Sequence, residues 1–322
     1  MKLVVTIDTE EDNWANYSPI DNSVENIKHL NELQAIFDQY GVKPTYLVTY
    51  PVVTNPQSVD ILKGILEKGK CEIGMHCHPW NTPPFEGRGT ISKQDTMLCN
   101  LNPVVVHKKL SHLHEIIQKN FKITPTSFRA GRYGFGPAVA NSLLKLGYRI
   151  DSSVTPFVSW EKYYGPDFSA FYPHHFRFSV QGLDHKDENG QLLEIPATIG
   201  FLQSNFAAAN RKMKKLERPF ARKLHIAGIL ERLGLLNKTW LSPEMSSVND
   251  MIKLAERMQK NMYSVLNFTF HSTSLKVGSS PFVKKDIDKR KFYWKIETFL
   301  KYSVNSGWQC KTLKDLEECI KT

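Results

Sequence analysis

The sequence contains no long hydrophobic run. No stretch approaches the roughly 18–20 consecutive apolar residues that span a bilayer. At the amino terminus, Met1 and Lys2 precede only a three-residue apolar run, and acidic residues follow at once. A secretory signal needs an apolar core of about 7–15 residues. We therefore predict a cytoplasmic protein that has no membrane-spanning helix.

Cysteine is scarce and is not paired by spacing. The five cysteines are odd in number, and none of them forms a Cys-x-x-Cys motif. Disulfide frameworks and common structural zinc sites depend on such patterns. Free thiols in a reducing compartment are therefore the expected state.

Nucleic-acid-binding signatures are also absent, although the chain is basic. The formal net charge is +10, but no helix-turn-helix, zinc-finger or RNA-binding motif accompanies it. The excess is local, because residues 205–243 contain nine basic and two acidic residues and so carry a net +7. Apolar residues are interspersed there, which suits a helix at an anionic membrane. A lid that binds pyrophosphate, or a helical insertion packed on the domain, would also suit this composition.

Elsewhere the chain alternates between strand and helix patterns. Short apolar runs predict strands over 2–7, 44–49, 71–75, 126–128, 148–151, 193–196, 264–270 and 308–310. Apolar residues at helical spacing predict helices over 23–40, 59–68, 103–121, 137–146, 248–262, 289–306 and 312–320. This alternation predicts one domain over 1–322, a distorted (β/α) barrel of about seven parallel strands that contains the helical basic insertion 205–243.

Polar residues follow the predicted strands at the points where the strands end. They are Asp8, Glu10, Glu11, Asp12, His76, His78, Arg129, Arg132, Asp151 and His271. In (β/α) barrels the carboxyl ends of the strands form one rim, where function resides. We therefore expect these side chains to share one site.

Two histidines and a run of acids suggest a metal. In an extended segment His76 and His78 point to the same side, while Cys77 between them points away. Neutral imidazoles suit divalent transition metals, above all zinc. The four carboxylates within residues 8–12 repel one another unless a cation or arginines neutralise them. Trp80, two residues further on, would either pack in the core or offer a platform for a sugar ring.

Further candidates lie at later strand ends. The arginines of the segment 127–134 can orient carboxylates, and its glycines allow backbone N–H groups close to a ligand. His271, at the end of a buried strand, suits a proton donor because its pKa lies near neutrality. An aspartate such as Asp151, if paired with it, would hold the ring and favour its charged form.

These segments, in this order, resemble the polysaccharide deacetylase family, also called carbohydrate esterase family 4 or the NodB-homology domain. The resemblance runs from Leu3 to about Leu316, apart from the insertion. Segments 72–84, 128–134 and 193–196 are similar to a branch associated with bacterial surface-polysaccharide biosynthesis. The resemblance implies a distorted barrel with a divalent metal, usually zinc, held by one carboxylate and two histidines.

The resemblance also implies catalytic roles. Asp8 matches the general base, and Arg129 matches the residue that orients it. Tyr133 matches the residue whose backbone N–H helps to bind the oxyanion. Asp151 and His271 match the pair that forms the general acid.

The expected metal ligands depart from the family pattern. Thr9 stands where the family has a second aspartate, so Glu10 is the expected carboxylate ligand, and Glu11 or Asp12 could replace it. The family's two histidines lie four residues apart, and Trp80 stands at the second place. His76 and His78 are therefore the expected pair of imidazoles, and Trp80 and Arg132 are expected to contact substrate.

The implied reaction is removal of an N-acetyl group from an amino sugar, with release of acetate. For a cytoplasmic protein, a lipid-linked or nucleotide-linked precursor at the inner face of the membrane is the expected substrate. An amidohydrolase of a non-sugar or cyclic amide is one alternative. A non-catalytic carbohydrate-binding barrel is another, because Thr9 and Trp80 break the family pattern.

Overall fold

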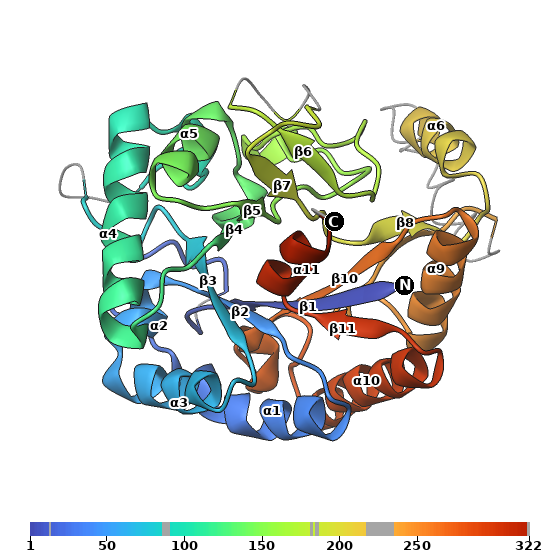
Figure 1. Ribbon diagram of the computed structural model, residues 1–322, viewed down its shortest axis with the longest axis horizontal. Helices are drawn as coiled ribbons and strands as arrows, with labels where there is room; N and C mark the ends of the chain where they lie inside the picture. Colours follow the sequence, from blue (N-terminus) through green and yellow to red (C-terminus); the bar gives the residue numbers. More distant parts are fainter. Residues whose placement is uncertain (13, 86–90, 181–182, 184–186, 217–234, 321–322) are drawn as a thin grey trace.

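The computed structural model describes residues 1–322 apart from 13, 86–90, 181–182, 184–186, 217–234 and 321–322. Its centre is a curved sheet in which parallel strands run in the order β10-β1-β2-β3-β4-β5-β7. These strands are β1 (Lys2–Thr9), β2 (Thr45–Val48), β3 (Glu72–Cys77), β4 (Ser127–Ala130), β5 (Ile150–Asp151), β7 (Leu192–Glu194) and β10 (Val265–His271). Helices surround the sheet (Figure 1), so the predicted distorted (β/α) barrel of about seven parallel strands is confirmed.

Two more strands extend this sheet. β6 (Phe176–Phe178) pairs antiparallel with β7, and β11 (Gln309–Lys311) pairs parallel with β1. Among the described residues, β7 and β10 do not pair. Instead, the Asn267 N–H donates to Thr198 Oγ1 at 2.8 Å, and the Thr198 N–H donates to the Asn267 carbonyl at 3.3 Å. The segment that contains Thr198, which follows β7, therefore bridges the gap between β7 and β10.

The helices follow the predicted order, with one addition, α2, that the sequence analysis did not predict. They are α1 (Leu30–Gln39), α2 (Tyr50–Thr54), α3 (Pro56–Glu67), α4 (Pro103–Phe121), α5 (Pro137–Lys145), α6 (Phe206–Leu216), α9 (Val248–Lys260), α10 (Asp286–Asn305) and α11 (Leu313–Ile320). The helix expected over 23–40 is wrong in its first turns, which form the 3₁₀ helix η1 (Glu25–His29), where the Asp12 carboxylate accepts backbone N–H bonds. Within the described ranges, no helix has the length and apolar character needed to cross a membrane.

Apolar side chains on the two faces of the sheet form two cores. Along β1, Leu3 and Val5 belong to the larger core that also includes the surrounding helices, whereas Val4 belongs to the smaller one. This alternation follows from the two-residue period of a strand. The smaller core includes Leu313 and Leu316 of α11, which lies at the centre of the barrel in Figure 1.

Helix α11 blocks the amino-terminal end of the barrel. The Leu313 N–H donates to Thr45 Oγ1 at 3.1 Å, and the Lys314 N–H donates to the Glu72 carboxylate at 3.1 Å. Thr45 and Glu72 are the first residues of β2 and β3. The opposite, carboxyl-terminal rim is the end at which the predicted site residues lie.

An excursion of the chain lies between β7 and β10. Strands β8 (Ile199–Phe201) and β9 (Lys238–Trp240) pair antiparallel and bracket residues 202–237. Helix α6 follows β8 and agrees with the expected helical start of the insertion 205–243, but the expected helix is wrong at its end, where β9 pairs with β8. The part of that expectation that concerns 217–234 lies outside the described residues.

Candidate active site

Three acceptor groups converge at the carboxyl-terminal rim. Glu10 lies just beyond β1, His76 lies in β3, and His78 follows β3. The Nε2 atoms of the two histidines are 3.0 Å apart, and Glu10 Oε2 lies 3.8 Å from the first and 3.4 Å from the second. All three side chains are buried. They meet because only β2 separates β1 from β3 in the sheet.

Hydrogen bonds on the far side of each ring determine which nitrogen carries the proton. His76 Nδ1 lies 2.9 Å from the backbone carbonyl of Arg129, and His78 Nδ1 lies 2.8 Å from Glu11 Oε1. Both partners only accept, so each Nδ1 donates and each Nε2 faces the cluster, where it presents a lone pair when its ring is neutral. Two such lone pairs and the Glu10 oxygen repel one another unless a cation or a proton lies among them. The cluster therefore fits a divalent metal held by two imidazoles and one carboxylate.

The ionisation of the cluster reflects its burial. Burial raises the pKa of Glu10 to about 8, and neighbouring carboxylates add to the shift while His271 and His78 oppose it. Burial lowers the pKa of His76 to about 3, so this ring is neutral and available as a ligand. A bound cation would favour the charged form of Glu10.

The two alternative carboxylates face other partners. Asp12 pairs with Lys276 Nζ at 3.0 Å and caps the first turn of η1. Glu11 contacts the Nδ1 side of His78, opposite the Nε2 atom. Glu10 is therefore the carboxylate that the structure places among the ligand atoms of the histidines.

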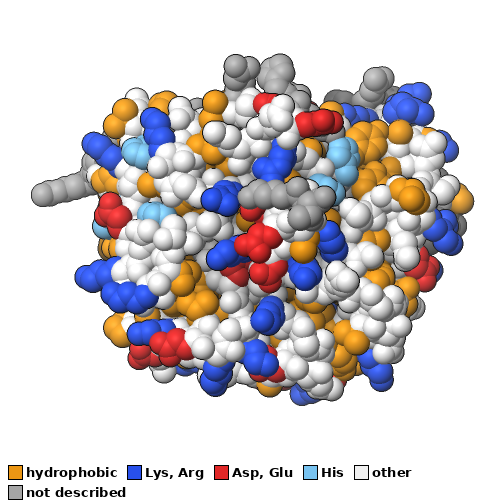
Figure 2. All heavy atoms as spheres, in the orientation of Figure 1, with side chains coloured by type: hydrophobic (Ala, Val, Ile, Leu, Met, Phe, Trp, Pro, Cys, Tyr) orange, Lys and Arg blue, Asp and Glu red, His pale blue; other side chains and the backbone are white. Residues whose placement is uncertain are grey.

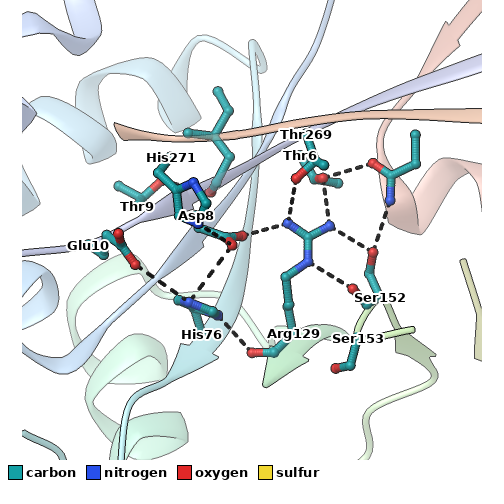
Figure 3. A network of polar contacts seen from close by, with 12 residues as sticks. Thr6, Asp8, Thr9, Glu10, His76, Arg129, Ser152, Ser153, Thr269 and His271 are labelled. Atoms are coloured by element: carbon teal, nitrogen blue, oxygen red, sulfur yellow. Dashed lines mark hydrogen bonds and ion pairs between the residues drawn. The ribbon is translucent and has the colours of Figure 1, made fainter. Parts of the chain in front are cut away.

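Asp8, near the end of β1, lies beside this cluster. Its Oδ1 accepts a hydrogen bond from Arg129 Nη1 at 2.5 Å, and its Oδ2 lies 4.0 Å from His76 Nε2. Arg129 is fully buried, and its five N–H groups all donate (Figure 3). The acceptors are Asp8, Thr269, Thr6, and both the hydroxyl and the carbonyl oxygen of Ser152. Arg129 thus holds one oxygen of Asp8 and leaves the other facing the cluster.

The same neighbours determine the charge of Asp8. Burial by itself raises its pKa, but Arg129, His76 and His271 outweigh burial and lower it to about 2. Asp8 is therefore a carboxylate throughout the neutral range, as a general base must be.

His271, the last residue of β10, has a carboxylate partner. Its Nδ1 lies 2.9 Å from Glu244 Oε2, and its Nε2 lies 3.6 Å from Asp8 Oδ2. Glu244 Oε1 accepts hydrogen bonds from the His271 backbone N–H and the Ser274 hydroxyl. Burial by itself lowers the pKa of His271, but Glu244 and nearby carboxylates raise it to about 10. Glu244 thus holds the ring and keeps it charged.

The structure corrects the expected pairing of Asp151 with His271. The register of β5 with β7 places Asp151 opposite Glu194, and the two carboxyl groups are hydrogen-bonded. Asp151 also accepts a hydrogen bond from the Ser153 hydroxyl at 2.6 Å. Burial raises its pKa to about 6, which favours a proton shared with Glu194. Asp151 thus bonds to groups near the end of β5, and Glu244 is the carboxylate that pairs with His271.

Trp80 packs against His78. Only 5% of its surface is exposed. Its ring stacks on His78 with centroids 4.1 Å apart, and the ring of Tyr17 meets it edge-on at 5.0 Å. The Trp80 N–H donates to Glu11 at 3.2 Å. Trp80 borders the cleft, but its small exposed fraction and its ring contacts favour the core-packing alternative over a platform for a sugar ring. Its contact with substrate stays a prediction.

Arg132 and Tyr133 line the same cleft. Both have positive φ angles, 53° and 59°, which side-chain-bearing residues seldom adopt. Arg132 donates to Thr96, and its guanidinium lies 4.9 Å from the centre of the Tyr17 ring. The ring of Tyr133 stacks on Trp160. Backbone strain of this kind clusters at functional sites, and Tyr133 stays the predicted oxyanion donor.

A cleft of about 280 Å³ joins these groups. Its walls include residues that sequence reasoning did not single out: Trp14, Trp160, Trp240, Glu244 and Phe282. Trp14 meets the ring of His271 edge-on at 4.6 Å. None of these residues belongs to a spaced motif. Only the position of Trp14, two residues after the acidic segment 8–12, was a usable signal in the sequence.

The fold and the site together define a class of protein. It is a distorted (β/α) barrel with a buried cluster of two histidines and one carboxylate, beside an aspartate held by arginine. No protein-family model matches the chain, and no curated protein matches it.

Solved structures resemble the chain at low identity. One is described as a polysaccharide deacetylase from Mycobacterium smegmatis, with 13% identity, a TM-score of 0.48, and coverage of 97% of this chain and 93% of that one. Another is the peptidoglycan deacetylase PdaC from Bacillus subtilis, with 13% identity, a TM-score of 0.43, and coverage of 99% and 91%. A family 4 acetyl xylan esterase from Clostridium thermocellum, in complex with a cobalt ion, has 20% identity, a TM-score of 0.30, and coverage of 44% and 54%. These likenesses are too distant to carry an argument about function.

Proposed function

We propose that this chain is a divalent-metal-dependent hydrolase that removes the acetyl group from an N-acetylated amino sugar, with zinc as the expected metal. The observation that carries the proposal is the convergence of the acceptor atoms of Glu10, His76 and His78 beside the Arg129-bound Asp8. In such a set, a divalent cation supplies polarisation of the amide carbonyl and acidification of a water molecule. The sequence resemblance to polysaccharide deacetylases supports the same reaction.

The proton transfers belong to residues of the chain. Asp8, ionised and held by Arg129, takes the proton of the water that attacks the carbonyl carbon. The backbone N–H of Tyr133 donates to the oxyanion that forms, and such a donor contributes roughly 3 kcal/mol. His271, kept charged by Glu244, protonates the amide nitrogen as the C–N bond breaks. The products are acetate and the free amine.

Aromatic side chains support a sugar ring as the group that carries the acetamide. The rings of Trp160 and Trp240 both lie near the ring of Tyr133, at ring-centre distances of 5.3 and 6.4 Å. All three are partly exposed in the cleft and offer apolar faces to the C–H groups of a pyranose. We propose a glycan precursor carried on a lipid or a nucleotide as the natural substrate, at the inner face of the membrane.

Assays of acetate release and of imide ring opening test this function. The protein is incubated with N-acetylated amino sugars and, separately, with cyclic imides. Acetate release from the sugars is the expected result. Ring opening of imides alone would favour the non-sugar amidohydrolase, and sugar binding without hydrolysis would favour a non-catalytic barrel.

Replacement of Glu244 by glutamine is expected to move the alkaline limb of the pH–rate profile to lower pH. Glu244 raises the pKa of His271, so the transferable proton is present below that raised pKa and is lost as the pH rises through it. Glutamine keeps the hydrogen-bonding shape without the charge, and the limb should fall by about 1–2 pH units. The measurement is kcat/KM across the neutral and alkaline range.

The matched control is Glu256→Gln, which neutralises an exposed glutamate on α9. It should leave both limbs of the bell-shaped profile in place. If the limb does not move in Glu244→Gln either, His271 is not the general acid.

The outer face of α6 supports association with an anionic membrane. Its exposed side chains are basic, while Met213 and Leu216 pack against the core. Figure 2 shows Lys and Arg side chains gathered over this helix at the upper right. The cations are Arg211, Lys212, Lys214 and Lys215. Basic residues near an anionic bilayer are worth about 1 kcal/mol each.

Neutralising these four residues to glutamine is expected to weaken binding to phosphatidylserine-containing vesicles by tenfold or more at low salt. Vesicle co-sedimentation of the full chain measures the effect. A control with the same change in charge replaces four exposed cations, one just before α10 and three within it. They are Lys284, Arg290, Lys291 and Lys301. Equal loss in both variants, or a wild-type chain that ignores such vesicles, would contradict membrane association through α6.

A further inference from the structure

The carboxylate of Glu11 is held by four donors. Its Oε1 accepts hydrogen bonds from His78 Nδ1 at 2.8 Å, Asn81 Nδ2 at 2.7 Å and Trp80 Nε1 at 3.2 Å. Its Oε2 accepts the Thr49 hydroxyl at 3.2 Å. The side chain is 4% exposed. Both oxygens of Glu11 therefore accept hydrogen bonds from side chains of the protein. These bonds hold the carboxylate in place without any contribution from a bound metal.

This arrangement orients the ring of His78. The hydrogen bond to Glu11 fixes the proton on Nδ1 and directs Nε2 toward Glu10 and His76. The stacked ring of Trp80 covers one face of the imidazole. A histidine that donates to a carboxylate is a more basic ligand than one that donates to a carbonyl, as His76 does.

The spacing of the motif explains why such support is needed here. His76 lies within β3, where strand pairing holds its backbone, whereas His78 lies beyond the strand's last residue, Cys77. A residue outside the ladder depends on side-chain contacts for its orientation. Glu11 supplies these contacts from the segment that follows β1.

We infer that Glu11 is a positioning residue for the metal site, which acts on the cation through His78 and does not ligate it. This inference rests on the proposed metal-dependent function. It states that the geometry and donor strength of one imidazole ligand depend on the charge of Glu11. It also gives a role to two of the four carboxylates within residues 8–12, since Glu10 ligates the cation and Glu11 orients His78.

The test is zinc affinity of the demetallated full chain, measured by calorimetry with Zn²⁺ alone. Glu11→Gln keeps an acceptor oxygen for His78, and the Thr49 hydroxyl can accept from the new amide, so the fold is retained. Zinc affinity should fall by about 10- to 100-fold. Glu72→Gln is the matched control, because Glu72 is a buried, hydrogen-bonded glutamate at the opposite end of β3, and its zinc affinity should equal that of the wild type.

Cobalt absorption separates positioning from ligation. With saturating Co²⁺, Glu11→Gln should reproduce the wild-type visible bands, whereas Glu10→Gln should change them. Altered bands in Glu11→Gln, or unchanged zinc affinity, would overturn the inference. If Glu11→Gln does not fold, Trp80→Phe, which removes one donor to Glu11, should show a smaller loss of affinity in the same direction. If the wild type binds neither metal, the proposed metal-dependent function fails. If the wild type and Glu11→Gln bind zinc equally tightly, only the positioning role of Glu11 fails.

Discussion

Removal of divalent cations with a chelator is expected to abolish acetate release, with a loss of roughly 10³-fold or more. The buried atoms of Glu10, His76 and His78 form a cluster of acceptors that only a cation or added protons can satisfy. Without the cation, the reacting carbonyl loses several kcal/mol of charge stabilisation in the transition state. Initial rates of acetate release are measured before chelation, after it, and after addition of Zn²⁺ or Co²⁺. One equivalent per chain should restore the rate.

A pair of histidine variants makes this prediction specific to the site. His78→Ala removes a proposed ligand and should lose both stoichiometric metal and activity. His112→Ala removes a partly exposed histidine that contacts Tyr50 on the outer side of the barrel, and it should retain both. Full activity of the wild type in the absence of divalent ions would contradict a metal-dependent mechanism.

Asp8→Asn is expected to lower kcat by roughly 10³-fold while metal binding and folding persist. Asparagine cannot take the proton of the attacking water, although it can still accept the hydrogen bond from Arg129. The guanidinium keeps its other acceptors on Thr6, Thr269 and Ser152, so it is not left without partners. Steady-state rates give the loss, and zinc titration and thermal unfolding show that the site and the fold remain.

Thr9→Val is the matched control for Asp8→Asn. Thr9 is the buried neighbour of Asp8 in β1, and its hydroxyl donates to the backbone carbonyl of Ile7. Valine keeps its shape, so kcat should stay within about threefold of the wild type. A variant Asp8→Asn that retains its rate and a flat pH profile would assign the base to another group.

Much of the site followed from the order of polar residues along the chain. Asp8, His76, Arg129 and His271 each lie at or near the carboxyl end of a buried parallel strand. Such ends meet at one rim, whatever the details of packing. The strand register then brings neighbours together, since Asp8 lies opposite His271, and His76 lies opposite Arg129.

Glu244 could not be found in this way. It follows β9, which is not part of the main sheet, and no spacing links it to His271. It reaches the histidine because the segment after β9 returns along β10, where the Thr269 N–H donates to the Leu241 carbonyl at 3.2 Å. A contact that depends on the path of a long excursion has no local signature in the sequence.

The amino-acid sequence by itself determined the parallel barrel, its rim and the residue types that meet there, because strand and helix periodicity and strand ends are local properties. Only the tertiary structure decided which acid serves which base. Asp151 pairs with Glu194 through strand register, Glu244 pairs with His271 through a returning segment, and Glu11 contacts Nδ1 of His78, not its Nε2. Carboxylates of similar chemistry differ in role through position alone, and position depends on contacts between residues far apart in the chain.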